Sequence, residues 1–194
     1  MIDGERQVSP TLDGIRRDHV SRYEWAATQI PSGSMVIDFA SGIGYGTKIL
    51  ADAGARVVGY DIDAEALSYG RTHYDSPDNA FIEADGNHPV PFEDSDIAIS
   101  FETIEHIENP RPLLLALRQA CPRLICSVPN EDVMPWMRED GATTAFHFRH
   151  YTKFEFAELL RGCGWCVTEW WGQEGPESEV ERDVAGRTLI AVCT

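Results

Sequence analysis

Short runs of apolar residues alternate with amphipathic stretches along most of the chain. The apolar runs are continuous, which is typical of strands covered on both faces, and the stretches between them carry apolar residues at helical spacing. This rhythm predicts strands at residues 35–39, 55–61, 79–85, 96–101, 123–129, 165–171 and 187–194. It predicts helices at residues 12–30, 45–53, 63–74, 110–121 and 151–164.

Residues at the expected helix ends support these limits. Asp63 is placed as an N-cap, and Thr152 and Glu155 have the spacing of a capping box. Gly164 follows the periodic stretch "FEFAELLRGC", and glycine commonly caps a helix at its C-terminus. The local signals and the periodicity therefore agree on where these helices begin and end.

The alternation of strands and helices indicates a fold class. Connections of this kind build an α/β, Rossmann-like, doubly wound and mostly parallel sheet, here with seven strands and with helices on both faces. A length of 194 residues suits one domain with one substantial core. We expect a single domain over 1–194, with an N-terminal helical segment at 1–33 and a lid or binding wall at 130–151. The stretch "GQEGPESEVERD", at 172–183, is expected to be a solvated acidic loop.

Acidic residues outnumber basic ones, with 32 Asp and Glu against 16 Lys and Arg and a net charge of −16 at pH 7. A surface of this sign repels polyanions, so broad nucleic-acid binding is disfavoured. No apolar run approaches the roughly 20 residues that span a bilayer, and the first residues lack the apolar core of a signal peptide. The five cysteines fit a reducing compartment, and Cys163 and Cys166 lie at an expected helix end, where C-x-x-C is not a redox site. We expect a cytoplasmic protein without a membrane partner.

A glycine-rich turn follows the first expected strand, in "VIDFASGIGYGTK" at 36–48. A triphosphate-binding loop needs Lys directly after its last Gly, whereas Thr47 stands between Gly46 and Lys48. A dinucleotide fingerprint needs a third glycine where Thr47 stands. Both phosphate-binding interpretations therefore fail on the register of the turn.

Two acids, Asp38 and Asp61, mark the ends of the first two expected strands. A carboxylate at Asp38 beside the backbone amides of the turn suits a ligand with a cationic amine or sulfonium rather than a pyrophosphate. Asp61 can accept hydrogen bonds from both hydroxyls of a ribose. Because doubly wound sheets bind ligands beyond the carboxyl ends of their strands, the binding site is expected at these acids.

Several motifs then occur in a characteristic order: "VIDFASGIGYGT", "VVGYDID", "IEADG", "DIAISFETIEHIENP" and "LICSVPN". In this order and spacing they resemble the successive motifs of class I S-adenosylmethionine-dependent methyltransferases, especially the small bacterial type with E-x-x-E-H after the fourth strand. The resemblance covers roughly Arg22 to Trp171, and it departs from the family at Ala40, where the usual turn has a glycine. It implies S-adenosylmethionine as the cofactor.

The resemblance also implies which residues bind this cofactor. The turn residues would contact the methionine part and Asp61 the ribose, while Ile62 would pack on the adenine ring. Tyr23 matches an Arg-Tyr pair in relatives, so it either folds over the cofactor or packs as an ordinary aromatic residue. The expected cofactor-binding residues are Tyr23, Asp38, Ala40, Ser41, Gly42, Gly44, Asp61, Ile62, Asp85, Gly86, Phe101 and Glu102.

Three histidines are candidates for a catalytic base, because the ordinary pKa of histidine lies near working pH. They are His106 after the fourth strand and His147 and His150 in the lid. A base is needed only where the methyl acceptor carries a proton. We assign this role to His106 and His150.

A divalent cation is the alternative role for "ETIEH". If this stretch begins a helix, Glu102, Glu105 and His106 share one face, and His147 or His150 would complete the site. The constellation resembles that of metal-dependent small-RNA 2′-O-methyltransferases and of ubiquinone-pathway O-methyltransferases. The same "EHI" also occurs in small-molecule methyltransferases that need no metal, so our primary assignment contains no metal site.

The sequence therefore predicts an enzyme that moves a methyl group from S-adenosylmethionine to an oxygen or nitrogen atom of a small molecule. Neither nucleic acid nor a membrane is an expected partner. Two alternatives stay open, which are metal-assisted methylation of an RNA ribose 2′-oxygen and a non-catalytic, cofactor-binding regulatory protein. The acceptor wall is expected from the lid, through Trp136, Phe146, His147, Arg149, His150 and Tyr151.

Overall fold

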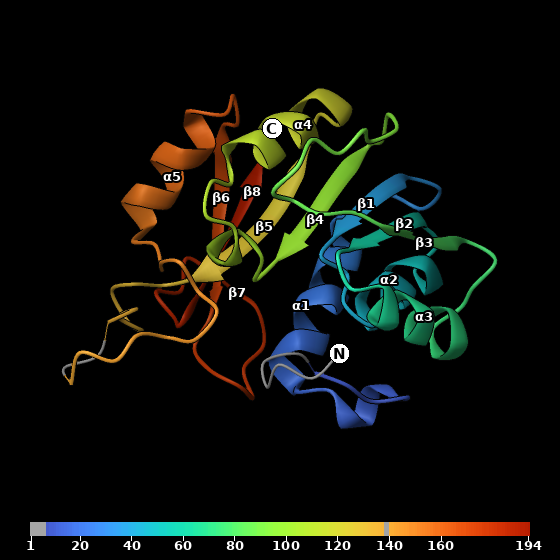
Figure 1. Ribbon diagram of the computed structural model, residues 1–194, viewed down its shortest axis with the longest axis horizontal. Helices are drawn as coiled ribbons and strands as arrows, with labels where there is room; N and C mark the ends of the chain where they lie inside the picture. Colours follow the sequence, from blue (N-terminus) through green and yellow to red (C-terminus); the bar gives the residue numbers. More distant parts are fainter. Residues whose placement is uncertain (1–6, 138–139) are drawn as a thin grey trace.

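The computed structural model describes residues 7–137 and 140–194, arranged as a central sheet between two layers of helices (Figure 1). Residues 1–6 of the expected N-terminal segment and 138–139 of the expected lid lie outside the described residues. The strands are β1 (Met35–Phe39), β2 (Arg56–Asp61), β3 (Asn79–Glu83), β4 (Ile97–Phe101), β5 (Leu124–Pro129), β6 (Val167–Gln173), β7 (Glu181–Arg182) and β8 (Thr188–Cys193). The helices are α1 (Arg17–Thr28), α2 (Tyr45–Asp52), α3 (Ala64–His73), α4 (Arg111–Ala120) and α5 (Lys153–Arg161), with the short 3-10 helices η1 (Leu12–Gly14) and η2 (Ile104–His106).

The strands of the sheet lie in the order β3-β2-β1-β4-β5-β8-β6-β7. β1 to β5 are parallel to one another, and β8 runs antiparallel between β5 and β6. From β1 the chain builds outward through β2 and β3 on one side and through β4 and β5 on the other. The strand order therefore reverses between β1 and β4, and a doubly wound sheet binds its ligands beyond the carboxyl ends of the strands at such a point.

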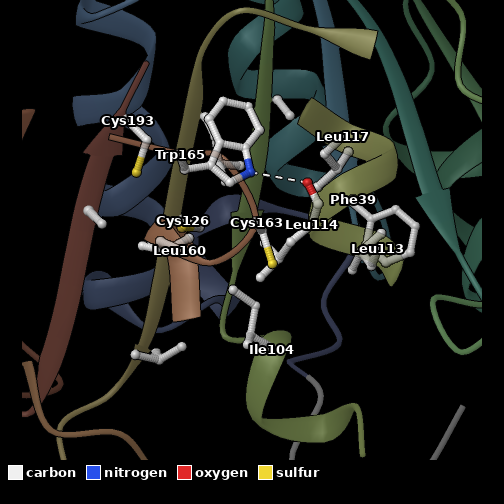
Figure 2. Packing of buried hydrophobic residues seen from close by; sticks show 14 of the residues in the cluster. Phe39, Ile104, Leu113, Leu114, Leu117, Cys126, Leu160, Cys163, Trp165 and Cys193 are labelled. Atoms are coloured by element: carbon white, nitrogen blue, oxygen red, sulfur yellow. Dashed lines mark hydrogen bonds between the residues drawn. The ribbon is translucent and has the colours of Figure 1, made fainter. Parts of the chain in front are cut away.

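Both faces of the sheet are covered, as the continuous apolar strands predict. The face under α4 and α5 holds the larger core, in which the indole Nε1 of Trp165 donates to the Leu114 carbonyl at 3.1 Å (Figure 2). The opposite face packs on α1 and α2, through residues such as Ala26 and Leu50. The predicted Rossmann-like, doubly wound architecture is confirmed.

The predicted local helix signals are present in the structure. Asp63 caps α3 by accepting hydrogen bonds from two backbone amides, and Thr152 and Glu155 form the reciprocal capping box of α5. Beyond the end of α5, Gly164 has φ +84°, and the amide of Trp165 donates to the Leu160 carbonyl at 3.1 Å. This is the six-to-one hydrogen bond of a glycine-capped helix end.

The sheet has eight strands, so the prediction of seven is wrong by one. The additional strand, β7, lies within 172–183, which the sequence predicted to be an acidic loop. It pairs antiparallel with β6, opposite Trp171 and Gly172, and the guanidinium of Arg182 lies 5.8 Å from the centre of the Trp171 ring. Hydrophobic periodicity could not predict this strand, because an edge strand exposes most of its side chains and its charged residues form no apolar run.

The five cysteines are free, and Cys121, Cys126, Cys163 and Cys193 are buried. Burial raises the pKa of the Cys163 thiol, which is the opposite of what a reactive thiolate needs. No described helix has both the length and the apolar character that crossing a membrane would require.

Candidate functional site

A cleft of about 690 Å³ opens at the carboxyl ends of the parallel strands and is lined in part by the start of α1. Eleven of the residues expected to take part in binding or catalysis line it: Tyr23, Ala40, Ser41, Gly42, Asp61, Ile62, Asp85, Gly86, Phe101, Glu102 and His106. Asp38, Gly44 and His150 are not among the residues that line the cleft. The structure thus brings together most of the expected site and places three of its members behind the surface.

The turn between β1 and α2 is built from backbone that favours glycine. Gly42 and Gly44 have φ values of +57° and +87°. Ala40, where the family turn has a glycine, has φ +63°, so its methyl group is held in the left-handed region at a cost of about 1–2 kcal/mol. Gly44 is the N-cap of α2 and does not line the cleft, and a Cβ there would lie 2.5 Å from the ring of Phe81. Gly44 therefore allows the turn to pack closely on Phe81.

Asp38 lies under the turn with no exposed surface. Its carboxylate accepts hydrogen bonds from the Tyr23 hydroxyl at 2.9 Å and from the Thr47 hydroxyl at 2.6 Å. Burial raises the pKa of Asp38 to about 6, against the lowering effect of these two hydrogen bonds. The predicted direct contact of Asp38 with a ligand is thus replaced by a supporting position, in which it holds Tyr23 and the first turn of α2.

Tyr23 forms part of the cleft floor. Its ring packs edge-on against Phe101 at 5.0 Å and Tyr45 at 5.7 Å between ring centres. It also lies directly over Gly46, where a Cβ would come within 2.4 Å of ring atoms. The absence of a side chain at Gly46 therefore lets α1 approach α2 and puts the aromatic surface of Tyr23 into the cleft.

Asp61 stands at the carboxyl end of β2 and is 4% exposed. Its carboxylate accepts from the amide of Gly42 at 2.8 Å and from that of Asp63 at 2.9 Å, so it links the turn to the start of α3. Beside it, Ile62 is 58% exposed and lines the cleft. An oriented carboxylate next to an exposed apolar side chain suits a ligand with hydroxyl groups and a flat apolar ring.

Asp85 and Gly86, which follow the neighbouring strand β3, also line the cleft. Asp85 accepts from the backbone and side-chain amides of Asn87, and the backbone hydrogen bond is the main cause of its lowered pKa. A Cβ at Gly86 would lie 2.9 Å from Ile107, so the wall is tight at this point. Both residues thus line the cleft, and their contact with the edge of an adenine ring stays a prediction.

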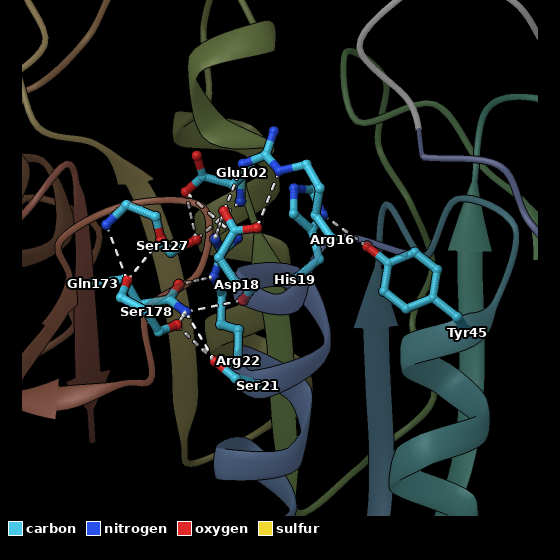
Figure 3. A network of polar contacts seen from close by, with 11 residues as sticks. Arg16, Asp18, His19, Ser21, Arg22, Tyr45, Glu102, Ser127, Gln173 and Ser178 are labelled. Atoms are coloured by element: carbon cyan, nitrogen blue, oxygen red, sulfur yellow. Dashed lines mark hydrogen bonds and ion pairs between the residues drawn. The ribbon is translucent and has the colours of Figure 1, made fainter. Parts of the chain in front are cut away.

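Glu102 follows β4 in a strained backbone conformation, with φ +49°. Its carboxylate accepts from the Ser127 hydroxyl at 2.8 Å and lies 3.8 Å from the guanidinium of Arg22 (Figure 3). The guanidinium of Arg22 also lies over the ring of Phe101, the preceding residue, at 5.7 Å from the ring centre. These contacts fix the carboxylate of Glu102 in the lining of the cleft, beside the ends of β4 and β5.

Several cleft residues at the start of α1 were not predicted from the sequence, namely Arg16 just before the helix and Asp18, His19 and Arg22 within it. Arg22 is 3% exposed and donates through Nε to Gln173 at 2.8 Å, and Gln173 in turn donates to the Asp18 carbonyl (Figure 3). Two signals in the sequence point to Arg22: it stands in the Arg-Tyr pair with Tyr23, and its four-residue spacing from Asp18 places both residues on one face of a helix.

The acidic loop after β6 is exposed along most of its length, as predicted, and it also forms part of the cleft wall. Gly175 and Pro176 line the cleft, and the Pro176 carbonyl accepts from the amide of Asp18 at 3.0 Å. The side chain of Arg17 also forms an ion pair with Glu179 at 2.7 Å. The loop and α1 therefore close the same side of the cleft together.

The three candidate histidines form a row. The imidazole Nδ1 of His150 contacts the Met134 carbonyl, and its Nε2 lies 2.7 Å from Nδ1 of His147. Because a carbonyl only accepts, a neutral His150 has its hydrogen on Nδ1, so His147 donates from Nδ1 and keeps its lone pair on Nε2. His106 contacts the Phe146 carbonyl through Nδ1 at 3.1 Å, which gives its neutral ring the same tautomer.

These contacts separate the roles of the three rings. His106 and His147 line the cleft with ring centres 4.5 Å apart, whereas the side chain of His150 is buried behind them. Burial, followed by the nearby His106 and His150, lowers the pKa of His147 to about 4. His150 therefore does not reach the reacting groups as we assigned, and it orients His147 instead.

Glu105, His106 and His147 offer ligand atoms that all lie within 4.8 Å of one another. The predicted helix in "ETIEH" is only the short η2, and the left-handed backbone of Glu102 turns that residue away from the common face. The expected set of Glu102, Glu105 and His106 is therefore not formed. A trio with His147 takes its place, and the backbone amide of Phe148 donates to the Glu105 carbonyl at 2.8 Å, joining the two segments.

The expected acceptor wall of the lid is formed in part. Phe146 and His147 line the cleft, together with Met134, which the sequence did not single out. Trp136 instead donates through Nε1 to the His147 carbonyl, and Arg149 donates to the Glu108 carbonyl. With the buried His150 and Tyr151, these side chains hold the segment in place behind its lining residues.

A model of a methyltransferase domain matches residues 37–122. A curated Mycolicibacterium smegmatis protein named "Probable S-adenosylmethionine-dependent methyltransferase" is 29% identical over 142 residues, which cover 71% of this chain and 54% of the relative. A Mycobacterium leprae protein named an uncharacterized methyltransferase is 33% identical over 82 residues, covering 41% of this chain and 30% of its own length. The chain thus spans about half the length, or less, of the curated relatives it matches.

Solved structures show the same fold. A TehB-like SAM-dependent methyltransferase from Corynebacterium glutamicum superposes with a TM-score of 0.67 at 19% identity, covering 90% of this chain and 86% of that one. A SAM-dependent methyltransferase from Thermotoga maritima superposes with a TM-score of 0.72 at 13% identity, covering 92% and 89%. The domain match over residues 37–122, the curated relatives and the shared fold thus make this chain similar to S-adenosylmethionine-dependent methyltransferases. The cofactor of this class is S-adenosylmethionine, and the cleft suits it through the oriented carboxylate of Asp61 beside the exposed Ile62.

Proposed function

We propose that the protein transfers the methyl group of S-adenosylmethionine to an oxygen or nitrogen atom of a small molecule. The observation that carries this proposal is the continuity of one cleft of about 690 Å³. One end has the turn, Asp61 and Ile62, and the other end has His106, His147 and lid residues. A cleft of this size suits a cofactor with a compact second ligand beside it.

The residues at the first end are assigned to the donor. Asp61 is proposed to accept from the ribose hydroxyls, Ile62 to pack on adenine, and Asp85 to meet the adenine edge. The backbone of Ser41 and Gly42, with Tyr23 beneath it, would hold the methionine part. The bound cofactor supplies an activated methyl group, so the protein contributes mainly by holding the acceptor close and aligned.

At the second end, His106 is the proposed base where the acceptor loses a proton. It lines the cleft, and its neutral tautomer has the lone pair on Nε2, since Nδ1 contacts the Phe146 carbonyl. His150 is proposed as a positioning residue that acts through His147. Glu102 would border the methyl group, held there by Ser127 and Arg22.

The charge of the protein supports a small acceptor over RNA, because a net charge of −16 opposes the approach of a polyanion. We also propose one domain over 1–194 and a cytoplasmic setting, which the free cysteines support. A non-catalytic binding protein is the remaining rival, and it would bind the cofactor without turnover.

Turnover is expected when the protein is incubated with S-adenosylmethionine and a panel of phenols, catechols and amines. The measurement is the release of S-adenosylhomocysteine. His106→Ala is expected to lower kcat about 100-fold on the active acceptor, because a positioned base contributes at least that factor, while the Kd for S-adenosylmethionine stays unchanged. Tight cofactor binding without product across the panel would favour the regulatory protein, and activity on RNA alone would overturn the small-molecule proposal.

A metal-assisted version of this reaction is favoured by one observation, the trio of Glu105, His106 and His147. Two imidazoles and a carboxylate suit zinc and similar divalent cations. Their outer contacts, from His106 to the Phe146 carbonyl and from His147 to His150, are of the kind that orients metal-binding histidines. Such a cation would polarise an acceptor hydroxyl.

Zinc is expected to bind the chelator-treated protein with one site per chain, as measured by calorimetry with Zn²⁺ alone. Glu105→Gln should weaken this binding at least tenfold, since it removes the charged ligand. Glu102→Gln is the matched control, because Glu102 lies outside the trio, and it should leave the Kd for zinc unchanged. Equal affinities for both variants and the unchanged protein would remove the metal site.

A further inference from the structure

Three arginines line the cleft, and two of them are occupied by other groups of the protein. Arg16 binds the carboxylate of Asp18 with two hydrogen bonds, at 3.1 and 2.6 Å. Arg22 is buried, donates to Gln173 and lies 3.8 Å from Glu102. Arg187 differs from both, because within the described parts of the chain its exposed guanidinium has no ion pair or hydrogen bond.

The backbone of Arg187 is nevertheless held firmly. Its carbonyl accepts from the amide of Asn130 at 2.8 Å, and the side-chain amide of Asn130 donates to the Gly186 carbonyl at 2.8 Å. Gly186 is packed so tightly that a Cβ there would lie 2.0 Å from the Gln173 carbonyl oxygen. The chain thus fixes the place from which the guanidinium extends, next to the end of β5.

The surroundings of Arg187 belong to the acceptor end of the cleft. Pro129, at the end of β5, is paired with Thr188 across the sheet, and both line the cleft. Met134 and Phe146 add apolar surface from the lid. The donor-binding turn lies on the other side of β4, so Arg187 is separated from it by two strands in the sheet order.

We propose that Arg187 binds an anionic group of the methyl acceptor, a carboxylate or a phosphate, and so selects acceptors with a compact apolar body and one such group. This inference rests on the proposed function, since it names the class of substrate for the same cleft. The planar guanidinium presents parallel N–H donors that match the two oxygens of either anion. Asn130 and Gly186 hold the backbone in advance, so less freedom is lost on binding than for an arginine in a mobile loop.

The negative net charge of the protein bears on which ligand Arg187 can attract. With a net charge of −16, an anion gains nothing from the long-range field and is attracted only by direct contact with a local cation. Arg187 is a cation of the cleft that no carboxylate neutralises within the described residues. An acidic protein that leaves such a group facing a ligand cleft is suited to a small anion and not to a polyanion.

The test measures binding of small probes by ¹⁹F NMR, with the protein saturated by S-adenosylhomocysteine and again without it. The probes are 4-fluorobenzoate, 4-fluorophenyl phosphate and the uncharged 4-fluorobenzamide. We expect one or both anions to bind at least tenfold more tightly than the amide, and the stronger of the two identifies carboxylate or phosphate. Arg187→Gln should abolish this preference, and Arg187→Lys should restore only part of it because lysine lacks the fork of donors.

Arg182→Gln is the matched control, since it removes the same charge five positions away, outside the cleft. Equal binding of anions and amide, or equal losses for the Arg187 and Arg182 variants, would overturn the proposal. So would displacement of the anion by S-adenosylhomocysteine, which would place it in the donor site. Failure of S-adenosylhomocysteine to bind would instead contradict the proposed function, and the probe series without it still decides the role of Arg187.

Discussion

Asp61→Ala is expected to weaken the binding of S-adenosylmethionine by about 3 kcal/mol, roughly a hundredfold increase in Kd. The carboxylate is 4% exposed and is proposed to accept from two ribose hydroxyls, each bond to a charged group contributing about 1.5 kcal/mol or more. It also accepts from the amides of Gly42 and Asp63. The alanine therefore removes ligand contacts and loosens the turn that holds the ligand. Isothermal titration calorimetry measures the change.

Two further variants separate these contributions. Asp61→Asn keeps the shape of the side chain and one acceptor oxygen, so its loss of affinity should be smaller than that of the alanine. Glu83→Ala removes an exposed carboxylate from the paired position on β3, outside the cleft, and should bind the cofactor as the unchanged protein does. Unchanged affinity for Asp61→Ala would contradict the assignment of this residue to the ribose.

Gly44→Ala is expected to lower the free energy of unfolding by about 2–5 kcal/mol. Two costs act at this position. The φ of +87° is unfavourable for any residue with a Cβ, by about 1–2 kcal/mol, and the new methyl group would lie 2.5 Å from the ring of Phe81. Because Gly44 is the N-cap that joins the turn to α2, displacement of the turn or of the helix should also weaken S-adenosylmethionine binding.

Gly33→Ala provides a control with nearly the same backbone. Its φ is +86°, and a Cβ there meets nothing within 4 Å, so only the conformational cost applies. Urea denaturation of both variants isolates the contribution of the Phe81 contact as the difference between them. If the two alanines destabilise the protein equally, the close packing beneath the turn is not a constraint on this position.

The fold was predictable from the sequence because its signals are local. Continuous apolar strands, helical periodicity and the N-cap at Asp63 each act within a few residues, and the same is true of the capping box at Thr152. The glycine turn and Asp61 could also be placed, since a βα unit brings a strand end and a helix start together in every doubly wound sheet. The missed strand β7 shows the limit, because its partner β6 rather than its own residues makes it a strand.

The acceptor end was less predictable for the same physical reason. The spacing of "ETIEH" suggested a helical face, yet Glu102 adopts φ +49° and the only helix formed within this stretch is the short η2. The position of His150 behind His147 depends on the Met134 carbonyl, 16 residues away in the chain. Neither the backbone conformation of Glu102 nor the contact of His150 with Met134 can be predicted from the spacing of residues.

The order of residues in the chain alone was enough to indicate the class of fold and the donor and to predict which acids bind it, because hydrophobic periodicity and turn geometry operate over short stretches. Tertiary contacts alone decided that Asp38 lies beneath the turn, that Arg22 joins α1 to β6, and that Arg187 faces the cleft without a partner among the described residues. A side chain finds its neighbours through space, and the burial and hydrogen bonding that set its chemistry exist only once distant segments have packed together.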